Sequence, residues 1–300
     1  MSANSVIATS VPPGDRNPAG NHIRLRRGLK LWRGRKRRHT AVAVAWGMLS
    51  VTSAVAAAQD MMRHVDLTSP EMTTAEMTRA DVAASIAAAT PAPVDFTGKK
   101  LSGLDLSGLD LSGAVLRAAK LNKTNLAGAK LDRAILDQAW LLEADLSHAS
   151  LTGAHMFAAQ MQRARLDAAD LSGARIVADL TGASLVGASL IGADLGADMK
   201  NQSMGLMHAV LKSANLDGAT LRDADLSRAD LEFASLKNAD LTNASFRGAA
   251  LGGATLIGVT ITGTDFLGAD LASMRLLAPI GLDAAKNLDK TRNMDRLLRE

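Results

Sequence analysis

From Phe96 onward, large apolar residues stand at every fifth position of the chain. The series begins with Leu101, Leu106 and Leu111 and continues to Ile176. Alanine precedes most of these residues by two positions, and a polar residue, often Asp or Asn, lies between the two. Ser, Thr, Arg or Lys follows, and then frequently Gly. The chain therefore repeats a five-residue unit, and the length of a repeat decides the fold class.

A period of five residues fits neither an α-helix nor a flat β-strand. In a helix, positions five apart are rotated by about 140°. In a strand they lie on opposite faces, because the strand period is two. A chain that turns a square corner every five residues buries each apolar residue together with the alanine two positions before it. Glycine two positions after the apolar residue suits such a corner, where φ is often positive.

The five-residue frame slips once and then recovers. Ile176 is followed by Leu180 after only four residues, and Leu195 is followed by Leu206 after eleven. A deletion compensated by an insertion predicts a kink just after Ile176 and a bulge within 196–205. A tolerated surface irregularity is the plainer interpretation of the bulge.

Two groups of residues are candidate interaction sites. The bulge is one of them, because loops on rigid scaffolds carry function more often than the scaffold does. Its candidate residues are Asp198, Met199, Lys200, Asn201, Gln202 and Met204. The other is a patch of residues twenty apart, which should stack on one face of a four-sided coil: Lys100, Lys120 and Trp140.

Both ends of the repeat block carry helical signals. Thr78, with Asp81 three residues later, resembles a capping box that opens a helix through Ala89. After Leu276 the frame ends, and apolar–Asp pairs recur every six residues, which predicts short helical turns. An open β-solenoid exposes backbone edges at its ends. We therefore expect both segments to act as caps, with dimerisation through the C-terminal cap as an alternative use.

Charge separates the N-terminal part from the rest of the chain. Ten of the 34 basic residues and one acidic residue lie within 1–58, which leaves the remainder with a net charge of −5. The basic run is followed by an uncharged stretch, 41–58, that ends in Ala-Ala-Ala. This is the layout of an export signal, and it is shorter than the ~20 strongly apolar residues of a permanent span. A retained membrane anchor and a basic tail that never meets a membrane are the alternatives.

These signals predict four parts. They are a basic arm with the export signal or anchor at 1–58, a linker and capping helix at 59–93, the repeat block at 94–276 and a C-terminal helical cap at 277–300.

Composition narrows the chemistry. The chain has no cysteine, which excludes disulfides, thiolate catalysis and cysteine-ligated metals. Its six histidines are scattered without metal-ligand spacing, and no phosphate-binding glycine loop or calcium-binding nine-residue repeat is present. We therefore predict no catalytic residue, no cofactor, no metal site and no small-molecule substrate.

The segments LSGLDLSGLDLSGAVL (101–116) and ANLDGATLRDADLSRADLEFASL (214–236) resemble the pentapeptide-repeat family, A-(D/N)-L-x-x in tandem. The resemblance implies an all-β solenoid, a right-handed quadrilateral β-helix. Some members are strongly acidic rods that resemble B-DNA, bind type II topoisomerases and confer quinolone resistance. This chain departs from those members, because its repeat block is only slightly acidic and an export-like segment precedes it.

We therefore expect a non-enzymatic scaffold that presents rigid faces to a protein partner whose identity the sequence does not give. We expect it to be exported (periplasmic or extracellular) or anchored in the inner membrane through 41–58. The alternative is a cytoplasmic DNA mimic that binds a type II topoisomerase (gyrase). The basic run at 24–38 has the charge for nucleic acid, but an export signal explains that run better.

Overall fold

The structure, a computed structural model, describes residues 65–197 and 207–298, and all of them fall within one compact unit. The predicted export segment at 1–58 lies outside the described residues. So do all six residues of the predicted interaction loop, from Asp198 to Met204.

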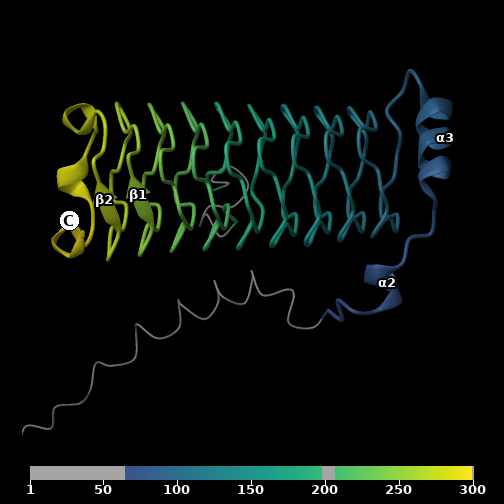
Figure 1. The fold of residues 1–300 in the computed structure, drawn as a ribbon, viewed down its shortest axis with the longest axis horizontal. Coiled ribbons are helices and arrows are strands. Elements are labelled where there is room, and N and C mark those ends of the chain that lie inside the picture. Colours follow the sequence, from purple (N-terminus) through teal and green to yellow (C-terminus); the bar gives the residue numbers. More distant parts are fainter. Residues whose placement is uncertain (1–64, 198–206, 299–300) are drawn as a thin grey trace, which may run out of the picture. The chain divides into compact units, whose positions relative to one another are not determined.

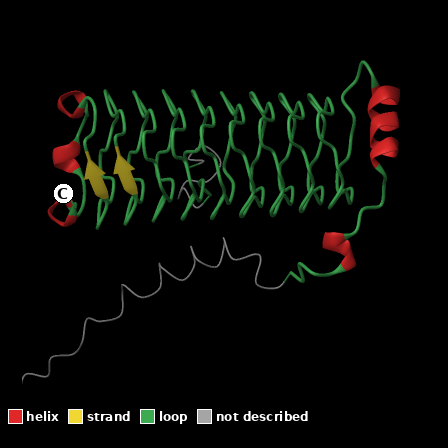
Figure 2. Cartoon of the chain, in the orientation of Figure 1, coloured by secondary structure: helices red, strands yellow, loops and turns green. Residues whose placement is uncertain are grey.

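Residues one coil apart pair as parallel β-bridges at every fifth position. Lys100 pairs with Lys120, and Lys120 pairs with Trp140, so twenty residues make one coil with four bridged sides. Two sides extend into short strands, β1 (Thr255–Ile257) and β2 (Arg275–Leu277), which pair in parallel. These are the strands drawn in Figure 2, and the other coils in the described residues are held by isolated bridges. The predicted stack of coils is confirmed, with few strands of regular length.

Most corners of the described coils are tight turns whose third residue has a positive φ. In the turn that starts at Leu116, the N–H of Ala119 donates to the Leu116 carbonyl oxygen at 3.1 Å, and Ala118 has a φ of 52°. A type II turn requires this left-handed conformation. Glycine occupies the position at many corners, as at Gly128, and this confirms its predicted place. Elsewhere the position carries side chains such as that of Arg133, at a φ of 56°.

The interior is a narrow column of leucine and alanine. Leu126 and the Ala129 of the next unit have no solvent exposure, and the same holds along most of the stack. Phe246 and Phe266 replace leucine on successive coils, and their rings stack with centroids 5.7 Å apart. Where Thr264 replaces alanine, its hydroxyl donates to the Leu241 carbonyl oxygen at 2.7 Å, so this buried polar group is satisfied.

The bridges show how the frame slips. Gln160 pairs with Asp179, nineteen residues on, and this confirms the deletion just after Ile176. Asp179 then pairs with Val210, thirty-one residues on, which is eleven more than a regular coil. The N–H of Ala209 donates to the Leu195 carbonyl oxygen at 3.2 Å, so the coil passes directly from Leu195 to Ala209. The insertion is therefore longer than the one extra residue that the sequence predicted. Ten of its eleven residues equal two repeat units, so they leave the five-residue frame unchanged and only the eleventh is visible in the pattern.

In the part of the chain described from residue 65 onward, two α-helices precede the first coil (Figure 1). α2 (Pro70–Thr73) lies within the segment predicted to be a linker. α3 (Arg79–Ala89) is the predicted helix, and both hydrogen bonds of its capping box are present, between Thr78 and Asp81. Val82 of α3 has no solvent exposure and belongs to the apolar core of the stack.

The last coil is built from six-residue sides. Its bridged positions are Ile280, Lys286, Arg292 and Leu298, each six residues after the one before. The extra residue is accommodated by short 3-10 helices, η2 (Leu282–Ala284), η3 (Leu288–Lys290) and η4 (Met294–Arg296). The six-residue spacing in the sequence therefore predicted short helical turns correctly.

The start of η2 provides a stability test. Gly281 has a φ of 77°, and a Cβ atom at this position would lie 2.0 Å from Oγ1 and 3.0 Å from Cα of Thr262. We expect Gly281→Ala to destabilise the protein by about 2–4 kcal/mol, the sum of left-handed strain and overpacking. Gly108→Ala is the control, because Gly108 has a φ of 68° but open space around its missing Cβ, and it should cost about 1 kcal/mol. Equal losses in urea unfolding would contradict the steric argument.

Candidate interaction surface

The Asp and Asn residues of the repeat satisfy the backbone of their own corners. Oδ1 of Asp105 accepts a hydrogen bond from the Ser107 N–H at 3.0 Å, and Oδ1 of Asp110 accepts one from the Ser112 N–H at 3.1 Å. These N–H groups begin the turns and point out of the coil, so the side chain two residues earlier is well placed to accept from them. The regular carboxylates of the sequence thus have a structural role.

At some corners without an Asp or Asn two residues before the turn N–H, this N–H donates instead to an Asp or Asn side chain of the preceding coil. The N–H of Leu142, which follows Trp140, donates to Oδ1 of Asn122 at 3.1 Å. The N–H groups of Thr152, Phe157 and Lys237 donate in the same way, to Asp132, Asp137 and Asp217. Neighbouring coils are therefore linked by side chains as well as by backbone bridges.

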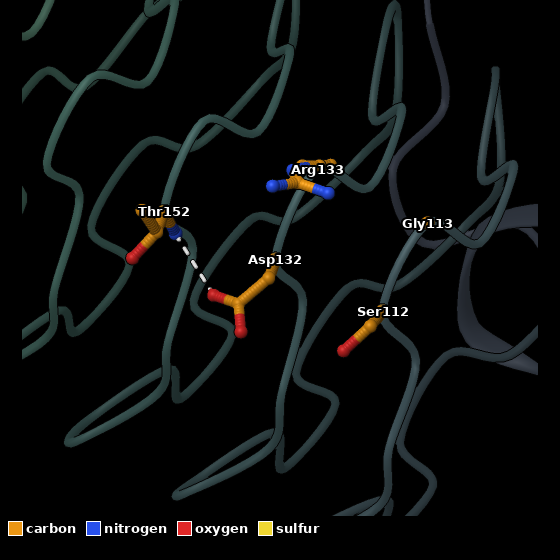
Figure 3. Close-up of a pocket in the computed structure, with 5 residues that line it drawn as sticks. All are labelled: Ser112, Gly113, Asp132, Arg133 and Thr152. Carbon is orange, nitrogen blue, oxygen red and sulfur yellow. Dashed lines mark hydrogen bonds between the residues drawn. The ribbon is translucent and has the colours of Figure 1, made fainter.

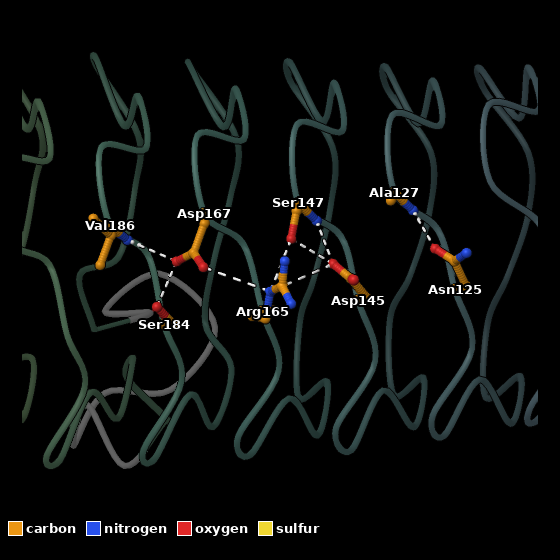
Figure 4. A network of polar contacts seen from close by, with 8 residues as sticks. All are labelled: Asn125, Ala127, Asp145, Ser147, Arg165, Asp167, Ser184 and Val186. Atoms are coloured by element: carbon orange, nitrogen blue, oxygen red, sulfur yellow. Dashed lines mark hydrogen bonds and ion pairs between the residues drawn. The ribbon is translucent and has the colours of Figure 1, made fainter.

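Cations lie beside many of these carboxylates. In the network of Figure 4, Nε of Arg165 lies 3.9 Å from Oδ1 of Asp145 and 3.6 Å from Oδ2 of Asp167, and it donates to Oγ of Ser147 at 3.1 Å. Other pairs along the outer surface are Lys130–Asp110, Arg117–Asp137, Arg163–Glu143, Lys212–Asp230, Arg222–Asp240, Lys237–Asp217 and Arg247–Asp265. The outer surface of the described coils is therefore a mixture of neighbouring opposite charges.

A hollow on the outer surface is lined by five residues of successive coils (Figure 3). They are Ser112, Gly113, Asp132, Arg133 and Thr152. Asp132 already accepts from the Thr152 N–H, so its carboxylate is part of the link between coils. Among the described residues, no group of three or more His, Cys, Asp or Glu side chains is placed to hold a metal ion.

The predicted patch is brought together on one side of the first coils. Lys100, Lys120 and Trp140 occupy successive bridged positions. Glu71 of α2 contacts both lysines, with Oε2 at 2.8 Å from Nζ of Lys100 and Oε1 at 3.9 Å from Nζ of Lys120. The hydrogen bond from Lys100 lowers the pKa of Glu71, which keeps this carboxyl ionised. The patch is therefore occupied by an acidic residue of the same chain, and its use by a partner stays a prediction.

We call residues 67–76 the strap, and the side of the first coils that it crosses the strap face. Met72 of the strap is 4% exposed, and its carbonyl oxygen accepts a hydrogen bond from Nδ2 of Asn122 at 3.1 Å. The Glu76 N–H donates to the Lys100 carbonyl oxygen at 2.9 Å. A hollow of about 310 Å³ lies between the strap and Leu142, Glu143 and Arg163 of the coils.

Sequence reasoning missed the strap. The segment reads Leu-Thr-Ser-Pro-Glu-Met at 67–72, in which Ser69 is an N-cap residue, Pro70 stands at the start of a helix and Glu71 is in its first turn. That order is a helix-start signal. It was available in the sequence, but it does not indicate against which side of the repeat block the helix packs.

Acid should weaken the fold. The hydroxyl and backbone N–H of Thr97 lower the pKa of Asp95, and those of Ser172 do the same for Asp170. The unfolded chain, with Asp near pKa 3.9, then binds protons at a higher pH than the folded one, so stability is lost as pH falls below about 4. We expect the melting temperature to fall between pH 5 and about 3, and to fall less in Asp170→Asn, which keeps the acceptor oxygen but cannot titrate. A melting temperature that holds steady or rises over this interval would refute the assignment.

A family model described as pentapeptide repeats matches in 8 copies, at residues 100–138, 138–173, 178–200, 206–243 and 239–273. No curated protein sequence matches the chain significantly.

Several solved structures are similar. HetL, a pentapeptide repeat protein involved in heterocyst differentiation regulation in the cyanobacterium Nostoc sp. strain PCC 7120, is 30% identical over 74% of this chain and 99% of its own, with a TM-score of 0.41. QnrB1, a plasmid-mediated fluoroquinolone resistance protein, is 18% identical over 59% of this chain and 91% of its own, with a TM-score of 0.26. A pentapeptide repeat protein from the Arabidopsis thaliana thylakoid lumen is 24% identical over 56% and 68%, with a TM-score of 0.17.

Proposed function

The chain belongs to the pentapeptide-repeat family, and on this premise we propose that it is a non-enzymatic scaffold that presents rigid faces of a right-handed quadrilateral β-helix to a protein partner. The supporting observation is the continuous bridging of successive coils. Every side is bridged to the next coil, and the register returns after the insertion, since Ser184 pairs with Asn215 and Asn215 with Ser235. Outward side chains therefore keep fixed spacings, which suits recognition by a preorganised surface.

The scaffold proposal is tested by using the chain as bait, with charge-reversal variants on different sides of the β-helix, to capture a partner protein. Arg163 and Arg222 carry exposed guanidinium groups on different columns. Full-length chain, Arg163→Glu and Arg222→Glu are used as baits in extracts that contain the native partner. We expect one specific protein to be retained by the native chain and to be lost with one of the variants only. Retention of no protein, or of the same proteins by all three baits, would argue against a face-specific scaffold.

We also propose that the segment before the coils exports the chain or anchors it in the membrane. Support comes from the charge layout of 1–58, where a basic run precedes an uncharged stretch with small residues at its end. None of the helices among the described residues has the length and hydropathy of a membrane-spanning segment. Sequencing of the mature N-terminus in fractionated cells tests the proposal. Cleavage near Gln59 in an extracytoplasmic fraction supports export, and an intact cytosolic chain overturns it.

The helices at the two ends of the described coils are proposed to act as caps. Val82 and Ile86 of α3 pack against the core, and so do Leu288, Met294 and Leu297 of the last coil. These contacts cover apolar ends that an open stack would leave exposed. The last coil also keeps exposed apolar side chains at Ile280 and Leu298, which are the groups available if the C-terminal cap is used for dimerisation.

The alternative function is a DNA mimic that binds a type II topoisomerase in the cytosol. QnrB1, among the similar structures, is a fluoroquinolone resistance protein. A DNA mimic needs a surface of uncompensated negative charge, whereas many carboxylates of these coils lie beside lysine or arginine, as Asp265 lies 2.9 Å from Arg247. Inhibition of gyrase supercoiling by the native chain at micromolar concentration would favour the alternative and defeat the exported scaffold.

A further inference from the structure

We propose that the strap face is a peptide-binding groove, which takes an acidic segment of a partner protein, with a helical turn like that of α2, at the place that residues 69–76 of the strap occupy in the free chain. The inference rests on the proposed scaffold function and names the chemistry of its partner. The partner segment carries a carboxylate followed directly by a long apolar side chain, in the manner of Glu71 and Met72.

Charge on the groove selects the acidic residue. Lys100 and Lys120 stand on adjacent coils, and Glu71 reaches both of them. Lys99 adds a third cation, 3.1 Å from the carboxylate of Glu76. The bridged backbone sets the spacing of the two coils, so the lysines face the strap as a preformed pair.

The floor of the groove is made to bind a peptide backbone. Asn122 is 8% exposed, and both polar atoms of its side-chain amide form hydrogen bonds. Oδ1 accepts from the Leu142 N–H, and Nδ2 donates to the Met72 carbonyl oxygen. The Lys100 carbonyl oxygen accepts from the Glu76 N–H. These contacts recognise main-chain groups of the bound segment, so they accept any sequence with the right backbone path.

The groove also holds polar capacity that the strap does not use. Ser102 is 4% exposed, and within the described residues its Oγ has no hydrogen-bond partner. It precedes Gly103, which lines the 310 Å³ hollow beside Met72. Most buried hydroxyls in folded proteins have a hydrogen-bond partner, so this one has unused capacity. A partner segment with a larger or more polar residue here gains a contact that the strap lacks.

The strap is held lightly enough to exchange. Met72 is its one buried side chain, and the others are exposed or half-buried. Its ion pairs to the half-buried Lys100 and Lys120 are made by Glu71, whose side chain is 55% exposed, so water and salt screen them in part. Because the strap is joined to the chain, it competes at high effective concentration, and a partner peptide enters when its own contacts exceed those of the strap.

The test uses a synthetic peptide of residues 67–78 (LTSPEMTTAEMT) and isothermal titration calorimetry with the full chain. The double substitution Glu71→Ala and Met72→Asp releases the strap and so empties the groove. A milder variant, Met72→Ser alone, is made in case the double variant does not fold. We expect both variants to bind the peptide at least tenfold more tightly than the native chain, whose groove is filled. Thermal unfolding confirms that the coils are intact in each variant.

Charge reversal then identifies the groove. Adding Lys100→Glu and Lys120→Glu to the emptied chain should weaken the peptide at least tenfold, and a peptide with Glu71→Lys should regain the loss. Lys130→Glu, on a different bridged column, is the matched control and should leave binding unchanged. No binding by either folded, emptied variant would overturn the proposal, as would binding that ignores the two lysines. The probe is a peptide of this chain and not the partner protein, so such a failure does not affect the scaffold proposal. That proposal is tested separately by the capture experiment.

Discussion

Leu190→Asp is expected to abolish cooperative folding of the coils or to cost more than about 4 kcal/mol of stability. Leu190 has no solvent exposure and is surrounded by the leucines and alanines of neighbouring coils. A carboxylate there has neither water nor a cation nearby, so it must either shift its pKa far upward or expel the coil from the stack. Urea unfolding followed by circular dichroism measures the loss.

The neighbouring residue provides the control. Ile191 is 44% exposed and belongs to the same corner, so Ile191→Asp places the same carboxylate one residue further along the chain but in water. It should change stability by less than about 0.5 kcal/mol. Similar losses for the two variants would mean that the five-residue frame does not decide which side chains are inside.

Val82→Asp is expected to release α3 from the first coil and to make the protein self-associate. Val82 is completely buried in the apolar core, and Phe96 and Leu101 lie in the first coil of that core. Without the helix, these side chains and the backbone edge of the coil are open to another molecule. Light scattering coupled to gel filtration should show larger, concentration-dependent species for this variant than for the native chain.

Ala83→Asp separates the loss of packing from a change in helix charge. Ala83 is exposed on the same helix and adjoins Val82, so its substitution adds the same charge without touching the core. We expect this variant to match the native chain in mass and melting temperature. If Val82→Asp also stays at the native mass while hydrogen exchange shows α3 to be open, the helix does not protect the end of the stack.

The interior of the coils was predictable because it depends on short-range periodicity alone. Leu at every fifth position and Ala two before it specify which side chains are inside, and no long-range pairing has to be known. The capping box at Thr78 and Asp81 is equally local, and it is present. The Asp residues at the bridged positions are explained by their own turns, as at Asp105 and Ser107.

Contacts between residues far apart in the sequence were harder to predict. The contact of Glu71 with Lys100 and Lys120 joins a short helix to two coils, and no pattern in the sequence states which side of the stack the helix crosses. The patch of lysines was therefore predicted as exposed surface, whereas the structure places an acidic partner on it. Asn122 gave no signal either, because its amide binds a carbonyl fifty residues earlier.

Many corner positions with a positive φ carry residues other than glycine, so conformational preferences of single residues do not predict which residue stands there. Glycine favours this conformation, but Lys123, Glu143 and Arg163 adopt it on three successive coils. Stacking with the coils on both sides offsets the local strain, so tertiary structure overrides the intrinsic preference. The ion pairs of Glu143 with Lys123 and Arg163 then follow from the enforced alignment of these positions.

The corner between Leu195 and Ala209 closes through a 3.2 Å backbone hydrogen bond even though eleven additional residues enter there. Closing a longer loop raises the entropic cost only logarithmically. This corner is consequently a natural graft point: an epitope tag or a foreign peptide exchanged for the insert would be displayed on the solenoid without disturbing the alignment of the coils on either side.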